Sequence, residues 1–236
     1  DYSGKNTKKS VSLAFFGIYI FGIVMMFMNP HEPTAYIAPT LVGLSGAVGV
    51  IRYELPDVVR NLKRGIFLTK RYILISISNL NYSIQRSLLL FSLMTIAVTG
   101  MLAILASNIH SPREFTTGII GYVVVIVLLV VSIIYKLSME AMTRKTLFLN
   151  LWKIGYTKKE LNKIVRQEVI SYYFVLILIP LVYIVFISGR FIYYGDMSLQ
   201  FAFIYVLSYV IPIIISGFIT YVQYINAVVK PIKGGK

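Results

Sequence analysis

Charged and aromatic side chains with binding potential are concentrated in one segment, LFLNLWKIGYTKKELNKIVRQE, at residues 147–168. The segment holds eight ionisable groups, counting Tyr156, and the only tryptophan of the chain. Lysines that surround a tryptophan and aliphatic residues can bind a surface that is both anionic and apolar, either a cytoplasmic partner or lipid headgroups. The two histidines, His31 and His110, each stand alone, so we predict no metal site.

The spacing within this segment predicts two helices that meet at a glycine. Leu147, Leu151 and Ile154 share one face of the first helix, and Gly155 follows at the position of a C-terminal cap. Thr157 and Glu160 then form the T-x-x-E capping box of a second helix. We expect a positive φ at Gly155, which lets the chain turn a corner between the two helices.

Apolar runs of membrane-spanning length surround this segment, and the fold class that they predict is an all-α membrane protein. A helix of roughly 20 apolar residues crosses a bilayer. We predict six transmembrane helices, at residues 11–28, 35–51, 87–106, 118–135, 169–189 and about 199–222. Gly43, Gly46 and Gly49 in the second run predict close helix packing.

The net charge of +14 is distributed by membrane side. With both termini in the cytoplasm, 21 of the 23 Lys and Arg residues lie inside, and only Arg113 and Arg190 lie outside. The basic charge is therefore mainly topological, with membrane lipids as the default partner, and no soluble basic module for nucleic acid is present.

An amphipathic pattern precedes the third run. Between residues 69 and 86, apolar side chains recur at helical spacing, at Ile73, Ile77, Leu80 and Ile84. We therefore predict a helix along the inner membrane surface before the third span.

The order of these features resembles the FtsX-like permease family of ABC transporters. The pair Arg144-Lys145 precedes Leu-x-x-x-Leu-x-x-Ile-Gly-x-Thr-x-x-Glu, and Glu168 opens the next span. Trp152 stands where the family pattern usually has a small or basic residue. The layout is similar to the C-terminal half of BceB-like members. However, only about ten residues lie where those members carry a large extracellular domain.

The resemblance implies a permease subunit of the bacterial plasma membrane that couples to a separate ATPase, expected as a dimer. It also implies a second partner, either the N-terminal half of the permease or a second permease copy. Residues 1–65 would hold two linking helices, and residues 66–236 the four-helix FtsX-like unit. The chain has no G-x-x-x-x-G-K-[ST] phosphate loop, so ATP hydrolysis belongs to the partner, and we predict neither enzymatic activity nor a cofactor.

The expected substrate is an amphipathic peptide or a lipid-like molecule that is exported, extracted or sensed, as in antimicrobial peptide resistance. The ATPase-coupling residues predicted in this way are Leu151, Trp152, Lys153, Ile154, Gly155, Tyr156, Thr157, Lys158, Lys159 and Glu160.

Two other functions remain open from the residues. An intramembrane enzyme or an ion-coupled secondary transporter would need ionisable groups within the membrane. No Asp, Glu, His, Lys or Arg lies deep in the six predicted spans, and we find no inverted repeat.

Overall fold

The computed structural model describes residues 2–28, 37–53, 71–109 and 111–230. Within these ranges the chain is helical and contains no strand. The helices are α1 Tyr2–Met28, α2 Ile37–Tyr53, α4 Arg71–Ser107, α5 Pro112–Thr143, α6 Lys145–Lys153, α7 Lys158–Tyr193 and α8 Leu199–Val228.

Four of the helices are long and apolar enough to cross a membrane. They are the Arg86–Ser107 part of α4, and α5, α7 and α8, with mean hydropathies of 2.4, 2.9, 2.5 and 2.2. The first two predicted spans fall on α1, whose apolar part is the shorter segment Ser10–Met25, and on α2, which has 17 residues. The chain is thus a helical membrane protein with four helices of spanning length among its described residues. The count of six spans stays a prediction.

The long helices expose apolar surface along much of their length. On α5, the exposed side chains include Ile120, Val123, Val127 and Leu128, which recur at helical spacing. A continuous apolar surface of this kind is unfavourable in water and is compatible with lipid hydrocarbon. The surface and the helix lengths therefore agree on a membrane environment.

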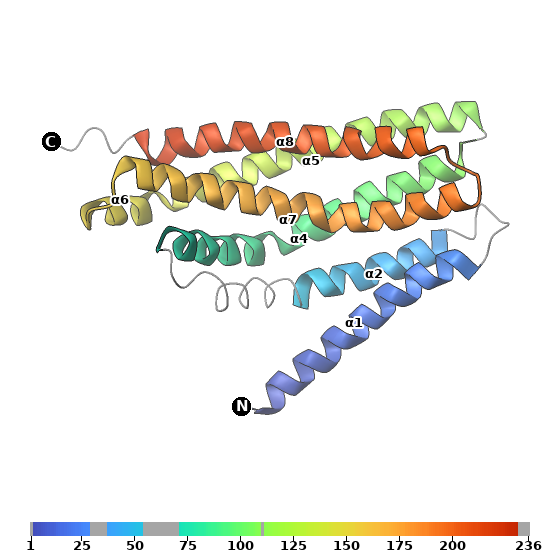
Figure 1. Ribbon diagram of the computed structural model, residues 1–236, viewed down its shortest axis with the longest axis horizontal. Coiled ribbons are helices and arrows are strands. Elements are labelled where there is room, and N and C mark those ends of the chain that lie inside the picture. The colour runs from blue at the N-terminus through green and yellow to red at the C-terminus, as the bar shows by residue number, and fades with distance from the viewer. Residues whose placement is uncertain (1, 29–36, 54–70, 110, 231–236) are drawn as a thin grey trace.

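The four long helices form a bundle in which each packs against two others. α4 and α8 each contact both α5 and α7, whereas α2 packs on α4 and α1 packs on α2 (Figure 1). The end of α8 and the whole of α6 lie at the same end of the bundle, and α1 slants so that its start lies closer to that end than its other terminus does (Figure 1). This arrangement agrees with termini on one side of a membrane. That this side is cytoplasmic stays a prediction.

Two buried tyrosines of α8 form hydrogen bonds with the neighbouring helices. The Tyr205 hydroxyl donates to the Val98 carbonyl oxygen of α4 at 2.8 Å, and the Tyr209 hydroxyl donates to the Leu176 carbonyl oxygen of α7 at 3.0 Å. Interhelical hydrogen bonds of this kind stabilise helix pairs where water is scarce. They hold the bundle to which α6 is attached.

The predicted close packing of the α2 glycines is confirmed. A Cβ atom at Gly46 would overlap the backbone of Tyr19 in α1, and one at Gly49 would overlap the Phe15 ring. Gly43 faces the Tyr183 hydroxyl of α7 in the same way. The small residues therefore let α1 and α7 approach the α2 backbone.

The predicted surface helix at residues 69–86 differs from the structure. Residues 71–107 form a single helix, α4, so the described part of the predicted segment is continuous with the third span rather than a separate element. Leu80 and Ile84 are buried within the protein rather than laid on lipid. Their apolar face has the same 3.6-residue period as the span that follows, and packing in the bundle covers it.

Candidate functional site

The short helix α6 stands at the end of the bundle, against α5, α7 and α8. Phe148 is its fully buried residue, and its ring meets the Tyr224 ring of α8 edge-on, with centroids 6.0 Å apart. Sequence reasoning missed Phe148. The expected apolar face is not uniformly buried, because Leu147 and the C-cap residue Ile154 are exposed and Leu151 is half-buried.

The glycine joint has the predicted geometry. Gly155 has a φ of 101°, and its N–H donates to the Trp152 carbonyl oxygen at 3.0 Å. The Tyr156 N–H donates to the Leu151 carbonyl oxygen at 3.2 Å. These two bonds make up a Schellman motif, which closes the C-terminus of α6.

The predicted capping box at the start of α7 is confirmed. The Thr157 N–H donates to Glu160 Oε2 at 2.7 Å, and the Glu160 N–H donates to Thr157 Oγ1 at 3.4 Å. Tyr156 packs against the apolar core that contains Leu161, as expected for a hydrophobic staple. α7 then runs without interruption from the cap through Glu168 into the apolar span.

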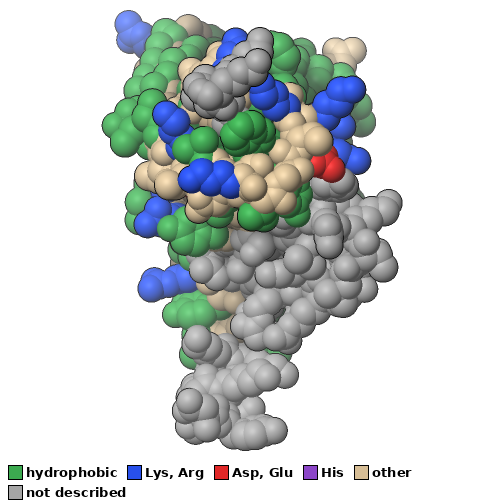
Figure 2. All heavy atoms as spheres, turned by 90° about the vertical axis from the view of Figure 1, so that its left-hand side faces the viewer, with side chains coloured by type: hydrophobic (Ala, Val, Ile, Leu, Met, Phe, Trp, Pro, Cys, Tyr) green, Lys and Arg blue, Asp and Glu red, His purple; other side chains and the backbone are tan. Residues whose placement is uncertain are grey.

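Of the remaining predicted coupling residues, Leu151 and Lys158 are half-buried. The four exposed ones form what we call the α6 surface: Trp152, Lys153, Ile154 and Lys159. Ile154 is 73% exposed and Trp152 is 37% exposed, and both lysines are exposed. Lys and Arg side chains gather around this end of the molecule, with few acidic atoms in view (Figure 2). The structure thus presents apolar side chains among cations, as the sequence indicated.

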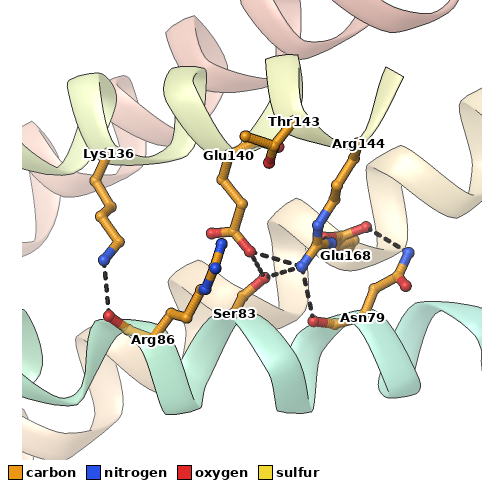
Figure 3. A network of polar contacts seen from close by, with 8 residues as sticks. All are labelled: Asn79, Ser83, Arg86, Lys136, Glu140, Thr143, Arg144 and Glu168. Carbon is orange, nitrogen blue, oxygen red and sulfur yellow. Dashed lines mark hydrogen bonds and ion pairs between the residues drawn. The ribbon is translucent and has the colours of Figure 1, made fainter. Parts of the chain in front are cut away.

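A buried ionic cluster lies at the base of α6. Arg144 joins α5 to α6, and its guanidinium contacts Glu140 Oε1 at 2.6 Å and pairs with Glu168 of α7 (Figure 3). The same guanidinium donates to Ser83 Oγ of α4 at 2.8 Å and to the Asn79 carbonyl oxygen at 3.2 Å. One side chain therefore ties α4, α5 and α7 together where α6 begins.

Most of the hydrogen-bonding groups in this cluster are satisfied. The Ser83 hydroxyl donates to Glu140 Oε1 at 2.7 Å, and the Asn79 amide donates to Glu168 Oε2 at 3.2 Å. Burial lowers the pKa of Arg144, but Glu168, Tyr224 and Glu140 together outweigh this effect and raise the pKa above its usual value. Loss of one partner from such a buried pair costs about 3–5 kcal/mol.

The sequence revealed only part of this cluster. Arg144 and Glu168 belong to the FtsX-like pattern, but the predicted contacts did not include their ion pair or the one between Arg144 and Glu140. The i, i+4 spacing of Glu140 and Arg144 was the available signal. Asn79 and Ser83 had none, because only tertiary packing brings α4 to this point.

Among the described residues, four charged side chains are buried, and all of them lie just outside the predicted spans: Glu140, Arg144, Glu168 and Arg190. Glu140 and Glu168 lie near the α6 end of α5 and α7, and Arg190 lies near the far end of α7. Arg190, expected in an outer loop, is 1% exposed, with its guanidinium carbon 4.9 Å from the centroid of the Tyr194 ring. Contact with an aromatic ring offsets part of its desolvation.

Among the described residues, no group of three or more His, Cys, Asp or Glu side chains could hold a metal ion. His31 and His110 lie outside the described residues. A comparison with protein-family models, curated proteins and solved structures finds no match to this chain.

Proposed function

We propose that this chain is the transmembrane permease subunit of an ABC transporter, working with a separate ATPase. The observation that supports this proposal is the construction of α6. It is a short helix at one end of a membrane bundle. It carries exposed side chains, and a buried ionic cluster holds the residue where it begins, Arg144. The FtsX-like sequence pattern lies on this same segment.

The connections of α6 would let it pass force into the membrane. A displacement of α6 reaches α5 directly through Arg144, and it reaches α4 and α7 through the side chains that this arginine binds. At its other end, the Gly155 joint leads into the capped start of α7. Docking and release of a partner at α6 would therefore move three of the four long helices together.

The partner can be described by its chemistry. The α6 surface needs an apolar pocket for Trp152 and Ile154 and acidic groups for Lys153 and Lys159. Lys158 and Lys159 lie in the first turn of α7, where the helix dipole disfavours cations, so their charge serves no purpose within the helix. A groove with an acidic rim on an ATPase subunit, expected as a dimer, would meet both needs.

We further propose a bacterial plasma-membrane location with both termini cytoplasmic, and an amphipathic peptide or lipid-like substrate. The Lys and Arg asymmetry and the resemblance support these points. The second permease element would be an N-terminal half or another copy of the chain. α1 and α2 would act as linking helices beside the unit formed by α4 to α8.

One observation favours a different function, ion-coupled secondary transport. Glu140 and Glu168 are buried carboxylates, and Glu140 Oε2 accepts no hydrogen bond from the described residues. Buried carboxylates are typical of proton pathways in transporters. Uptake driven by a proton gradient in vesicles that contain the chain without an ATPase would favour this alternative.

The test of the ATPase proposal is co-purification from native membranes in mild detergent, followed by an assay of ATP hydrolysis. Trp152→Ala should weaken a protein interface by about 2 kcal/mol and release the ATPase. Tyr193→Ala is the matched control, because Tyr193 is an exposed aromatic residue at the opposite end of α7. Equal recovery of the ATPase with both variants, or none with the parent chain, would refute the proposal.

A further inference from the structure

An apolar groove runs between α7 and α8 on the outside of the bundle and encloses about 440 Å³. Ile170, Phe174 and Ile177 of α7 form one wall, and Ile214 and Phe218 of α8 form the other. Among the described residues, Arg166 is the one charged residue that lines it. The groove is thus apolar along its length, with a cation at one end.

The length of the groove corresponds to one leaflet of a bilayer. From Arg166 to Ile177, α7 rises by about 16 Å at 1.5 Å per residue. The hydrocarbon core of a bilayer is about 30 Å thick, so one leaflet contributes roughly half of that. Arg166 lies on the α6 side of this stretch, and the purely apolar wall begins beyond it.

The floor of the groove is closed and offers no strong polar partner. The Tyr173 ring lies against Gly217, where a Cβ atom would come within 3.3 Å of the ring. The Tyr173 hydroxyl pairs with Thr220 Oγ1 at 2.8 Å, so its hydrogen bond is made inside the protein. A transmembrane helix is about 10–12 Å wide and would lie across the groove rather than in it. An acyl chain fits the shape and the polarity better.

The mouth of the groove is cationic. Arg166 and Lys163 are exposed and lie three residues apart on α7. The carboxylate nearest to Arg166 in the sequence, Glu168, is buried and pairs with Arg144. We propose that this groove binds one anionic phospholipid, with its headgroup at Arg166 and one acyl chain between α7 and α8. The site is separate from the α6 surface and does not depend on the ATPase proposal.

The experiment is native mass spectrometry of the full chain in detergent, with added phosphatidylglycerol or phosphatidylcholine that carry the same acyl chains. The parent chain should retain phosphatidylglycerol preferentially. Arg166→Gln should lower that retention about fivefold, the change expected for one basic residue at an anionic headgroup. Arg86→Gln, which removes an exposed arginine outside this groove, is the control and should leave retention unchanged.

A second pair of variants tests the acyl-chain position. Ile214→Trp should fill the groove and remove the preferred binding, whereas Ile215→Trp, an exposed neighbour that does not line the groove, should not. Equal effects of Arg166→Gln and Arg86→Gln would overturn the proposal, as would equal effects of the two tryptophan variants. A lipid-free dimer that cross-links through a cysteine at position 170 would instead assign the groove to a second copy and would also overturn it.

Discussion

Two glycine joints turn the chain at the two ends of α7. Gly155 precedes the helix with a φ of 101°, and Gly195 follows it with a φ of 79°. At the far joint, the Gly195 N–H donates to the Ile192 carbonyl oxygen at 3.1 Å, and the Asp196 N–H donates to the Phe191 carbonyl oxygen at 2.9 Å. Both joints are therefore Schellman motifs, and each is followed by a helix with a hydroxyl N-cap.

The joints differ in what lies beside them. At the far joint, Phe191 and Met197 are buried, and the turn leads directly from one long helix to the next. At the near joint, the extra helix α6 stands between α5 and α7, and it keeps Trp152 and Ile154 exposed among lysines. The same backbone device thus serves as a simple turn at one end of α7 and supports an exposed binding surface at the other.

The largest expected difference between the joints is the side of the membrane on which each lies. The chain has no cysteine, so single cysteines can be introduced without background labelling. With an impermeant thiol reagent added to intact cells, Tyr193→Cys should react and Lys159→Cys should react only after permeabilisation. Labelling of position 159 from outside would reverse the proposed topology and would remove a cytoplasmic ATPase as the partner.

The next effect concerns the base of α6. Arg144→Ala would leave Glu140 and Glu168 buried without their cation, and we expect a loss of about 3–5 kcal/mol in the free energy of unfolding. Denaturant titration of the purified chain in detergent measures this loss. Arg113→Ala, which removes an exposed arginine at the far end, should change the stability little. Similar unfolding curves for both variants would show that the cluster does not anchor α6.

The smallest expected loss of stability comes from replacing either glycine, and the two replacements should differ in their effect on function. A Cβ atom at Gly155 or Gly195 meets nothing within 4 Å. A valine at either position is therefore destabilising only because of the positive φ, which costs on the order of 1 kcal/mol or more in the free energy of unfolding. Gly155→Val and Gly195→Val should therefore lose similar stability. Only Gly155→Val should lower substrate-stimulated ATP hydrolysis in the assembled transporter. Equal ATP hydrolysis by the two variants would show that the joint at Gly155 is an ordinary turn with no role in coupling.

The features that were predictable from the sequence depend on neighbours within a few residues. Gly155, Thr157 and Glu160 specify the joint and the cap through main-chain and side-chain geometry that the local order of residues already contains. The apolar runs similarly predict the long helices, because their length and composition are properties of one segment. These features could be assigned before any tertiary contact was known.

The features that were missed depend on residues far apart in the sequence. Ser83 and Glu140 are 57 residues apart, and no periodicity indicates that α4 and α5 bring them together. Phe148 is buried in the core and meets the ring of Tyr224, which comes from the distant helix α8. Arg190 is the exception, because its contact with the Tyr194 ring lies only four residues along the chain, and the predicted span of 169–189 ended one residue before it. Sequence reasoning therefore found the surface of α6 and missed its attachment.

The central claim is that the α6 surface docks on a separate ATPase, and site-specific cross-linking tests it most directly. A photoreactive amino acid at position 152 or at position 193 would be activated in native membranes, with the full chain as it is expressed. We expect a cross-link from position 152 to an ATP-hydrolysing subunit and none from position 193. Cross-links from position 152 to lipid alone, or to the same protein from both positions, would contradict it.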